Sequence, residues 1–305
     1  NHFDNTTYYF FMLALKRNSK INISYFPEEK SFDTMKLKNK YDIILIAENH
    51  SDATPELKGI QNLDIPVISR VGDPHDAKRK NKFFFHEKFK IKYYFNFMDK
   101  SYFYKFYPKK YPYKTIIFGL ESALYQDIKP YDERIKNKIL NSGVIGKTTI
   151  KSRVANKIIN PKRSSWYFYK LRTLCNKLKY VEHARDIEKK YKKKDYSYIL
   201  SQYRAAIGAT TFYPTIKYWE ISASGCLAFL EITKENQGEY LGYKDNETAI
   251  FINEKNYEKK FKKYLNDLDN PKWREIAQKG QKYTMNHLNN DHAVDSLVDL
   301  FNEVI

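Results

Sequence analysis

Two charged residues, Lys217 and Glu220, stand three positions apart in the stretch 214–225, PTIKYWEISASG. Pro214 suits the first turn of a helix and Gly225 suits its end, so the stretch predicts a short helix that carries both charges on one face. The apolar run that follows predicts a buried strand. Ligands of open α/β sheets sit beyond the carboxyl ends of the strands, which places the pair where a phosphate-bearing ligand would bind. The alternative is an ion pair on the surface of an amphipathic helix.

A glycine-rich turn, GVIGKTT, occupies residues 143–149. Its glycines are three positions apart, whereas the phosphate loop of nucleoside triphosphatases needs five, which argues against that class. The turn predicts a looser anion site made of a strand end, Gly146, Thr148 and the start of a basic helix. Lys147 or Arg153 would supply the charge. Arginine suits two phosphate oxygens and lysine acts as a point charge, and the sequence does not choose between them.

Two polar loops follow apolar runs in the first half of the chain. One is GDPHD at residues 72–76, and the other contains Glu48 and His50. Both lie at the carboxyl ends of expected strands, on the ligand side of such a sheet, which makes Glu48, His50 and His75 site candidates. The alternative is a polar turn in which Asp73 caps the helix that follows.

Cysteine and histidine spacings indicate no metal site. Cys175 and Cys226 lie in separate apolar segments and form neither a disulfide framework nor a ligand pattern. His287 and His292 are five positions apart and are expected to be helix-end residues. We therefore expect no metal and no bound cofactor.

Apolar runs alternate with helical stretches through the whole chain, a pattern that predicts parallel sheets covered by helices. The polar stretch 127–134 predicts a boundary, which gives domains at 1–132 and 133–305. Because such a domain usually begins with a strand and this one begins with a helix at 4–17, its first strand is expected to be missing.

The formal net charge of +18 favours three kinds of partner: nucleic acid, an anionic membrane surface, or phosphorylated small molecules. Residues 83–113 interleave aromatic and basic side chains. They could stack on single-stranded nucleic acid, but the alternation of helix and strand favours a structural role for these rings. No stretch approaches the length of a membrane span. The expected location is cytoplasmic, with peripheral contact at the inner face of the membrane left open.

The sequence around Glu220 resembles a known family. Lys217-Tyr218-Trp219-Glu220, then small residues, Gly225 and an apolar strand, look like the sugar-nucleotide motif K/R-x-F-E-x-x-A-x-G. This motif is typical of group 1 (family 4-like) glycosyltransferases, in particular their spore-protein-like branch. The resemblance implies a GT-B fold of two facing Rossmann-like domains. The first domain would hold the acceptor and the second a nucleoside-diphosphate sugar.

Roles for the candidate residues follow from this resemblance. Lys217, with Lys147 or Arg153, would stabilise the donor diphosphate, Glu220 would accept hydrogen bonds from the ribose hydroxyls, and His75 would orient the donor sugar or the acceptor. The remaining donor-site candidates are Thr211, Tyr213, Ser222 and Gly225. Phe212 stands where the fuller signature has a second Glu, so that contact is in doubt.

The resemblance also implies partners. They are a nucleotide-sugar donor and a glycan, lipid-linked or protein acceptor, without nucleic acid, and transfer is expected to be retaining and metal-independent. The rival interpretation is a non-catalytic basic module that binds nucleic acid or an anionic glycan on a degenerate glycosyltransferase fold.

Overall fold

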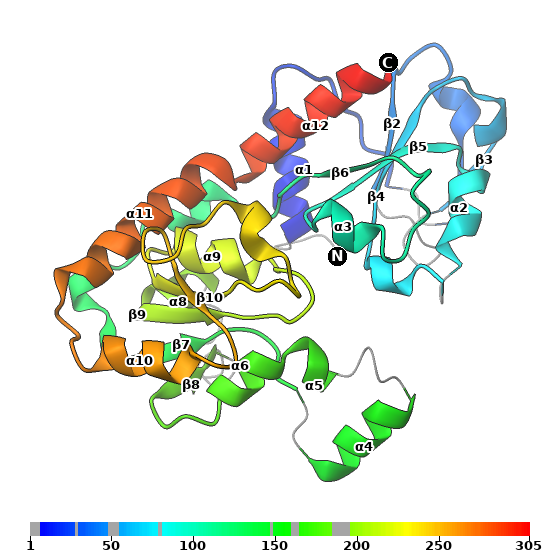
Figure 1. Ribbon diagram of the computed structural model, residues 1–305. Coiled ribbons are helices and arrows are strands. Elements are labelled where there is room, and N and C mark those ends of the chain that lie inside the picture. Colours follow the sequence, from blue (N-terminus) through cyan, green and yellow to red (C-terminus); the bar gives the residue numbers. More distant parts are fainter. Residues whose placement is uncertain are drawn as a thin grey trace. The chain divides into compact units, whose positions relative to one another are not determined.

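The computed structural model describes residues 7–27, 30–47, 55–78, 81–146, 149–159, 165–184 and 196–305. The chain divides into two compact units, one of residues 1–119 and 290–305 and one of residues 120–289 (Figure 1). Each unit has its own parallel sheet and its own apolar core. The predicted α/β class is therefore confirmed.

The sheet of the first unit has four strands, all parallel, in the order β2-β4-β5-β6. Its strands are β2 (Ile44–Ile46), β4 (Val67–Arg70), β5 (Ile91–Asn96) and β6 (Tyr113–Thr115). A separate parallel pair joins β1 (Ser31–Asp33) to β3 (Glu56–Lys58). Strand β4 is buried along its whole length, as expected for an inner strand of a parallel sheet.

The helices of the first unit come from both ends of the chain. They are α1 (Thr7–Arg17), α2 (Lys82–Lys88), α3 (Lys100–Phe103) and α12 (Asn290–Val304). Helix α12 lies beside α1, and the Asn290 side chain accepts a hydrogen bond of 2.7 Å from the backbone N–H of Gly119 (Figure 1). The sequence predicts a helix in this place but gives no sign that it joins the first unit.

Aromatic rings from residues 83–113 form the centre of this unit. Phe103 stacks on both Tyr107 and Tyr113, with ring centroids 4.4 and 4.2 Å apart. All three rings are buried, so they are closed to nucleotide bases. These three rings therefore have the structural role that the alternation of helix and strand favours, whereas Phe84 in the same stretch is exposed.

The second unit contains a five-stranded parallel sheet in the order β11-β10-β9-β7-β8. Its strands are β7 (Ile135–Asn141), β8 (Val181–His183), β9 (Tyr203–Gly208), β10 (Leu227–Glu231) and β11 (Ile250–Ile252). The chain runs from β7 to β8 on one side and then returns to β9 on the other. The strand order therefore reverses at β7, and such reversal points are where α/β sheets bind ligands, beyond the carboxyl ends of the strands.

Helices of very different length surround this sheet. They are α4 (Ile150–Ile159), α5 (Ser165–Phe168), α6 (Lys170–Cys175), α8 (Tyr196–Ser201), α9 (Lys217–Ala223), α10 (Tyr257–Leu265) and α11 (Pro271–His287). Helix α11 begins as its sequence predicts, with Pro271 in its first turn and the Asn270 side chain capping the N–H of Lys272. It lies against α9 and β10, so it holds the central motif against the sheet.

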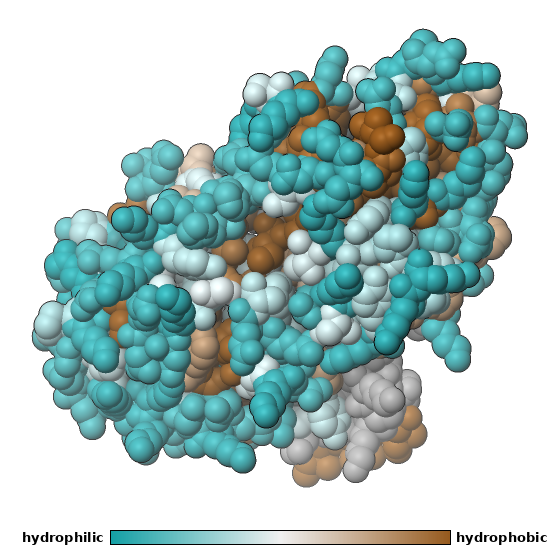
Figure 2. All heavy atoms as spheres, turned by 45° about the horizontal axis from the view of Figure 1, so that its top comes forward, coloured by the Kyte–Doolittle hydropathy of each residue, from teal (hydrophilic) through white to brown (hydrophobic). Residues whose placement is uncertain are grey.

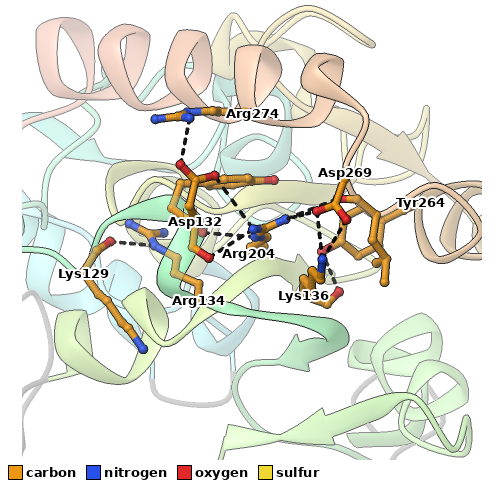
Figure 3. A network of polar contacts seen from close by, with 10 residues as sticks. Lys129, Asp132, Arg134, Lys136, Arg204, Tyr264, Asp269 and Arg274 are labelled. Carbon is orange, nitrogen blue, oxygen red and sulfur yellow. Dashed lines mark hydrogen bonds and ion pairs between the residues drawn. The ribbon is translucent and has the colours of Figure 1, made fainter.

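A polar network ties the start of the second unit to the amino end of its sheet (Figure 3). The buried Arg204, near the start of β9, donates to the carbonyls of Tyr131 and Asp132 and to the carboxylate of Asp269. Lys136 forms an ion pair of 2.7 Å with Asp269. These bonds attach the segment before β7 to the second unit, whereas the sequence places a boundary after residue 132. The network lies at the opposite end of the strands from Lys217.

Hydrophilic side chains cover most of the face drawn in Figure 2, in keeping with a charged-residue content of 30%. Among the described residues, no helix has the length and apolar character that crossing a membrane requires.

Candidate functional site

Helix α9 carries Lys217 and Glu220 on its partly exposed side, while the rest of the helix is buried. The Lys217 Nζ lies 3.0 Å from Oε2 of Glu220, and the two side chains are 32% and 15% exposed. On the opposite side of the helix Tyr218 and Trp219 are fully buried. The pair is therefore partly shielded from water, which separates it from an ordinary surface ion pair, although its members do contact each other as the alternative predicts.

The ring of Tyr196, the first residue of α8, contacts the ammonium group of Lys217. Its ring centroid lies 3.4 Å from Nζ of Lys217, and its hydroxyl shares a hydrogen bond with Ser142, the residue after β7. Burial works against the charge on Lys217, but Glu220 and Tyr196 outweigh it and raise the pKa of the ammonium above its ordinary value. Lys217 thus stays charged and is fixed beside the carboxyl end of β7.

The loop after β9 is held by the aromatic residue of the motif. The Tyr218 hydroxyl accepts from the backbone N–H of Thr210 at 3.0 Å and donates to the carbonyl of Glu231 at 3.0 Å. Asn236 donates to the carbonyl of Thr210 at 3.0 Å. These buried bonds join the carboxyl ends of β9 and β10, and they explain why a tyrosine stands before Trp219.

Three other residues predicted to bind the donor, Gly146, Thr211 and Tyr213, make contacts within the protein. The N–H of Gly146 donates to Thr173, and a Cβ there would come within 2.8 Å of the Trp166 backbone. Thr211 donates to the carbonyl of Tyr167, and Tyr213 is buried beside Phe168.

Two further candidates belong to the end of α9. Ser222 is buried and donates to the carbonyl of Tyr218, while Gly225 ends the helix at a φ of +69°. Lys147 and Thr148 lie outside the described residues, as does the side chain of Arg153 in α4. Donor contacts by these residues stay predictions.

Arg172 in α6 was missed from the sequence. Its side chain is only 2% exposed, and its Nη1 donates to the carbonyl of Val144 at 3.0 Å. Within the described part of the chain, its Nε and Nη2 have no hydrogen-bond partner. Burial lowers the pKa of this guanidinium, but arginine still carries its charge. A buried cation with two unused N–H groups is costly unless an anion pairs with it.

The backbone is shaped to admit this guanidinium. Gly143, just after β7, has a φ of +95°, and a Cβ at this position would lie 2.5 Å from Nη1 of Arg172. Arg172 is also close enough to Tyr196 to affect its pKa electrostatically. Arg172 and Lys217 therefore both act on Tyr196, Lys217 by direct contact with its ring and Arg172 through its charge, near the point where the strand order reverses. The sequence does contain a signal that could have pointed to Arg172. No Asp or Glu occurs between Glu133 and Glu182, so Arg172 has no acidic residue nearby in the chain.

Glu231, at the carboxyl end of β10, is a second buried ionisable group. Desolvation raises its pKa to about 7, and its Oε2 has no hydrogen-bond partner among the described residues. Arg172 acts on it electrostatically, but the described ion pairs do not join the two. Glu231 is therefore partly protonated near neutral pH.

His75 lies in the first unit, in the 3₁₀ turn Pro74–Asp76 that follows β4. Its Nδ1 is 3.4 Å from the hydroxyl of Tyr102. Asp73 stands at the N-cap of this turn without a side-chain capping bond. Ligand atoms of Asp73, His75 and Asp76 lie within 4.8 Å of one another, which is close enough for a metal ion. Glu48 and His50 lie outside the described residues.

No protein-family model and no curated protein matches the chain. Solved structures match its fold. An α-glucosyltransferase in complex with UDP and a 13-mer DNA containing a central A:G mismatch is similar over 98% of this chain and 97% of that one. The TM-score is 0.56 and the identity 10%.

Anabaena Alr3699/HepE in complex with UDP and glucose matches over 86% of this chain and 78% of that one, with a TM-score of 0.52 and 11% identity. The chain also spans 59% of the length of a chain in the GtfA/B complex, at a TM-score of 0.46. The likenesses to the first two structures show that the fold is of the GT-B class, built from Rossmann-like units.

Proposed function

We propose that this chain is a glycosyltransferase that moves a sugar from a nucleoside-diphosphate sugar to an acceptor. One observation carries the proposal: two fixed cations, Arg172 and Lys217, both act on Tyr196, whose hydroxyl is bonded to Ser142 just after β7. Two solved proteins of this fold were captured with UDP, which supports a nucleoside diphosphate as the anion.

The two cations suit different tasks. The unused Nε and Nη2 of Arg172 form a planar fork that can donate to two phosphate oxygens. Lys217 has three N–H donors, of which Glu220 occupies one, so donors are left for the ligand. A leaving nucleoside diphosphate gains negative charge as the glycosidic bond breaks. Cations that are already in place therefore stabilise the transition state more than the ground state.

Glu220 supplies the acceptor group of the site in this proposal. Its carboxylate is held by Lys217 and is 15% exposed, so it can accept hydrogen bonds from the ribose hydroxyls without a large rearrangement. His75 of the first unit would orient the donor sugar or the acceptor, and Lys147 and Arg153 would add charge near the phosphates. Assignment to the group 1 family, its spore-protein-like branch, and retaining, metal-independent transfer belong to the same proposal.

A thermal-shift screen tests the proposal. The chain is heated with uridine, guanosine and cytidine diphosphates and with their sugar conjugates. At least one nucleoside diphosphate should raise the unfolding temperature, because a ligand that binds only the folded state stabilises it. Absence of any shift, together with steeply salt-dependent binding of oligonucleotides, would support the basic binding module instead.

A further inference from the structure

Helix α4 carries a stripe of apolar side chains that its own unit leaves uncovered. Ile150, Val154 and Ile158 are 79%, 52% and 76% exposed, and their spacing of four places them along one side of the helix. Among the large apolar side chains that the structure describes, Ile150 and Ile158 are the most exposed. Figure 1 shows α4 standing apart from the sheet of the second unit.

Further apolar surface flanks this stripe in sequence. Val144, before α4, is 60% exposed, and Tyr167, after it, is 40% exposed. Single exposed apolar residues are ordinary on protein surfaces, but an ordered stripe of them along one helix marks an interaction surface.

The sequence on both sides of the stripe carries charge of one sign. Lys151 is exposed next to Ile150, and no acidic residue occurs between Glu133 and Glu182. Basic residues in and around α4 are Lys147, Lys151, Arg153, Lys157, Lys162 and Arg163. A partner must therefore offer negative charge as well as an apolar phase.

We propose that α4 docks the chain on an anionic lipid bilayer. Its isoleucines enter the boundary between headgroups and acyl chains, while the basic side chains reach the lipid phosphates. A nucleic acid would match the charge but leave Ile150 and Ile158 in water. A second copy would bring one positively charged α4 against another, which opposes association. This inference does not rest on sugar transfer.

Vesicle flotation with the full chain tests the proposal, using vesicles of pure phosphatidylcholine and vesicles that also contain phosphatidylglycerol. The chain should float with the anionic vesicles, and added salt should weaken this binding. The double variant Ile150→Ser/Ile158→Ser should lower partitioning by at least about tenfold. A matched control is Phe84→Ser, because Phe84 is 53% exposed but lies in α2 of the first unit. It should bind as the wild type does.

Four outcomes would overturn the proposal. The first is equal flotation of the double variant and the wild type, and the second is equal binding to neutral and anionic vesicles. The third is a dimer that the double variant no longer forms, which would make a second copy the occupant. The fourth is binding of a single-stranded oligonucleotide without any vesicle binding. The unfolding temperature of the double variant should equal that of the wild type, since both side chains are exposed. The flotation assay contains no nucleotide-sugar donor, so a negative result would not bear on the proposed transferase activity.

Discussion

Replacing Arg172 with methionine should change stability and ligand binding in opposite directions. The guanidinium has two N–H groups without described partners at 2% exposure, and each such group costs about 1–3 kcal/mol. Methionine has a similar length and removes that cost. It also removes one charged hydrogen bond to Val144, worth about 1.5–3 kcal/mol, and the desolvated contact with the Tyr169 ring, worth about 2 kcal/mol. The ligand-free variant should therefore be as stable as the wild type or up to about 2 kcal/mol more stable.

Binding of the nucleoside diphosphate should weaken sharply in the same variant. Loss of two charged hydrogen bonds to phosphate, at about 1.5–3 kcal/mol each, corresponds to a Kd at least about 100-fold higher. Urea unfolding without ligand measures the first effect, and isothermal titration calorimetry with whichever diphosphate stabilises the wild type measures the second.

Arg204 offers a matched control for this experiment. It is equally a buried arginine, but its N–H groups are occupied by Tyr131, Asp132 and Asp269 at the other end of the sheet. Arg204→Met should destabilise the chain by at least about 1–3 kcal/mol, because the carbonyls of Tyr131 and Asp132 lose their donor, and it should leave the Kd of the folded protein unchanged. If Arg172→Met behaves in this way as well, Arg172 is a structural cation and does not bind the diphosphate.

Three further side chains of the second unit can be tested by substitution: Glu220, Tyr218 and Glu231. Glu220→Ala should weaken use of the donor by about 1.5–3 kcal/mol in steady-state transfer assays, and an unchanged kcat/KM would remove Glu220 from the site. Tyr218→Phe should lower the free energy of unfolding by about 1–3 kcal/mol in urea titrations, because the buried N–H of Thr210 loses its partner, and a neutral result would contradict the network. The pKa of Glu231 is raised to about 7 from an ordinary 4.5, so the folded state binds this proton more tightly than the unfolded chain. Protonated Glu231 therefore contributes its full stabilisation to the fold below about pH 4.5, and this contribution disappears as the pH rises to 7. Over this range the free energy of unfolding of the wild type should fall by about 3 kcal/mol relative to that of Glu231→Gln. Parallel unfolding profiles of the two proteins between these pH values would show that Glu231 does not titrate as described.

The sequence predicts local features of this fold well. Strand β10 reads as an apolar run because it is covered on both faces, and Pro214 and Gly225 frame α9 through their own backbone preferences. The position of Lys217 beyond β9 follows from the order of strand and helix alone. These predictions need only neighbours in the chain.

What escaped prediction depends on contacts between distant residues. Arg172 becomes a site candidate only because Gly143, far from it in sequence, has no side chain and so leaves space for the guanidinium at the end of β7. Helix α12 reads as an ordinary amphipathic helix, and nothing within it shows that its partner is α1. The contact between Lys217 and Tyr196 likewise needs the fold, because strand β9 lies between their two helices in the sequence.

A crystal structure of the chain with a nucleoside diphosphate would show whether this ligand binds at Arg172 and Lys217. Diphosphate oxygens should lie within hydrogen-bond distance of Nε or Nη2 of Arg172 and of Nζ of Lys217. A diphosphate bound anywhere else, with both side chains placed as they are now, would contradict this prediction.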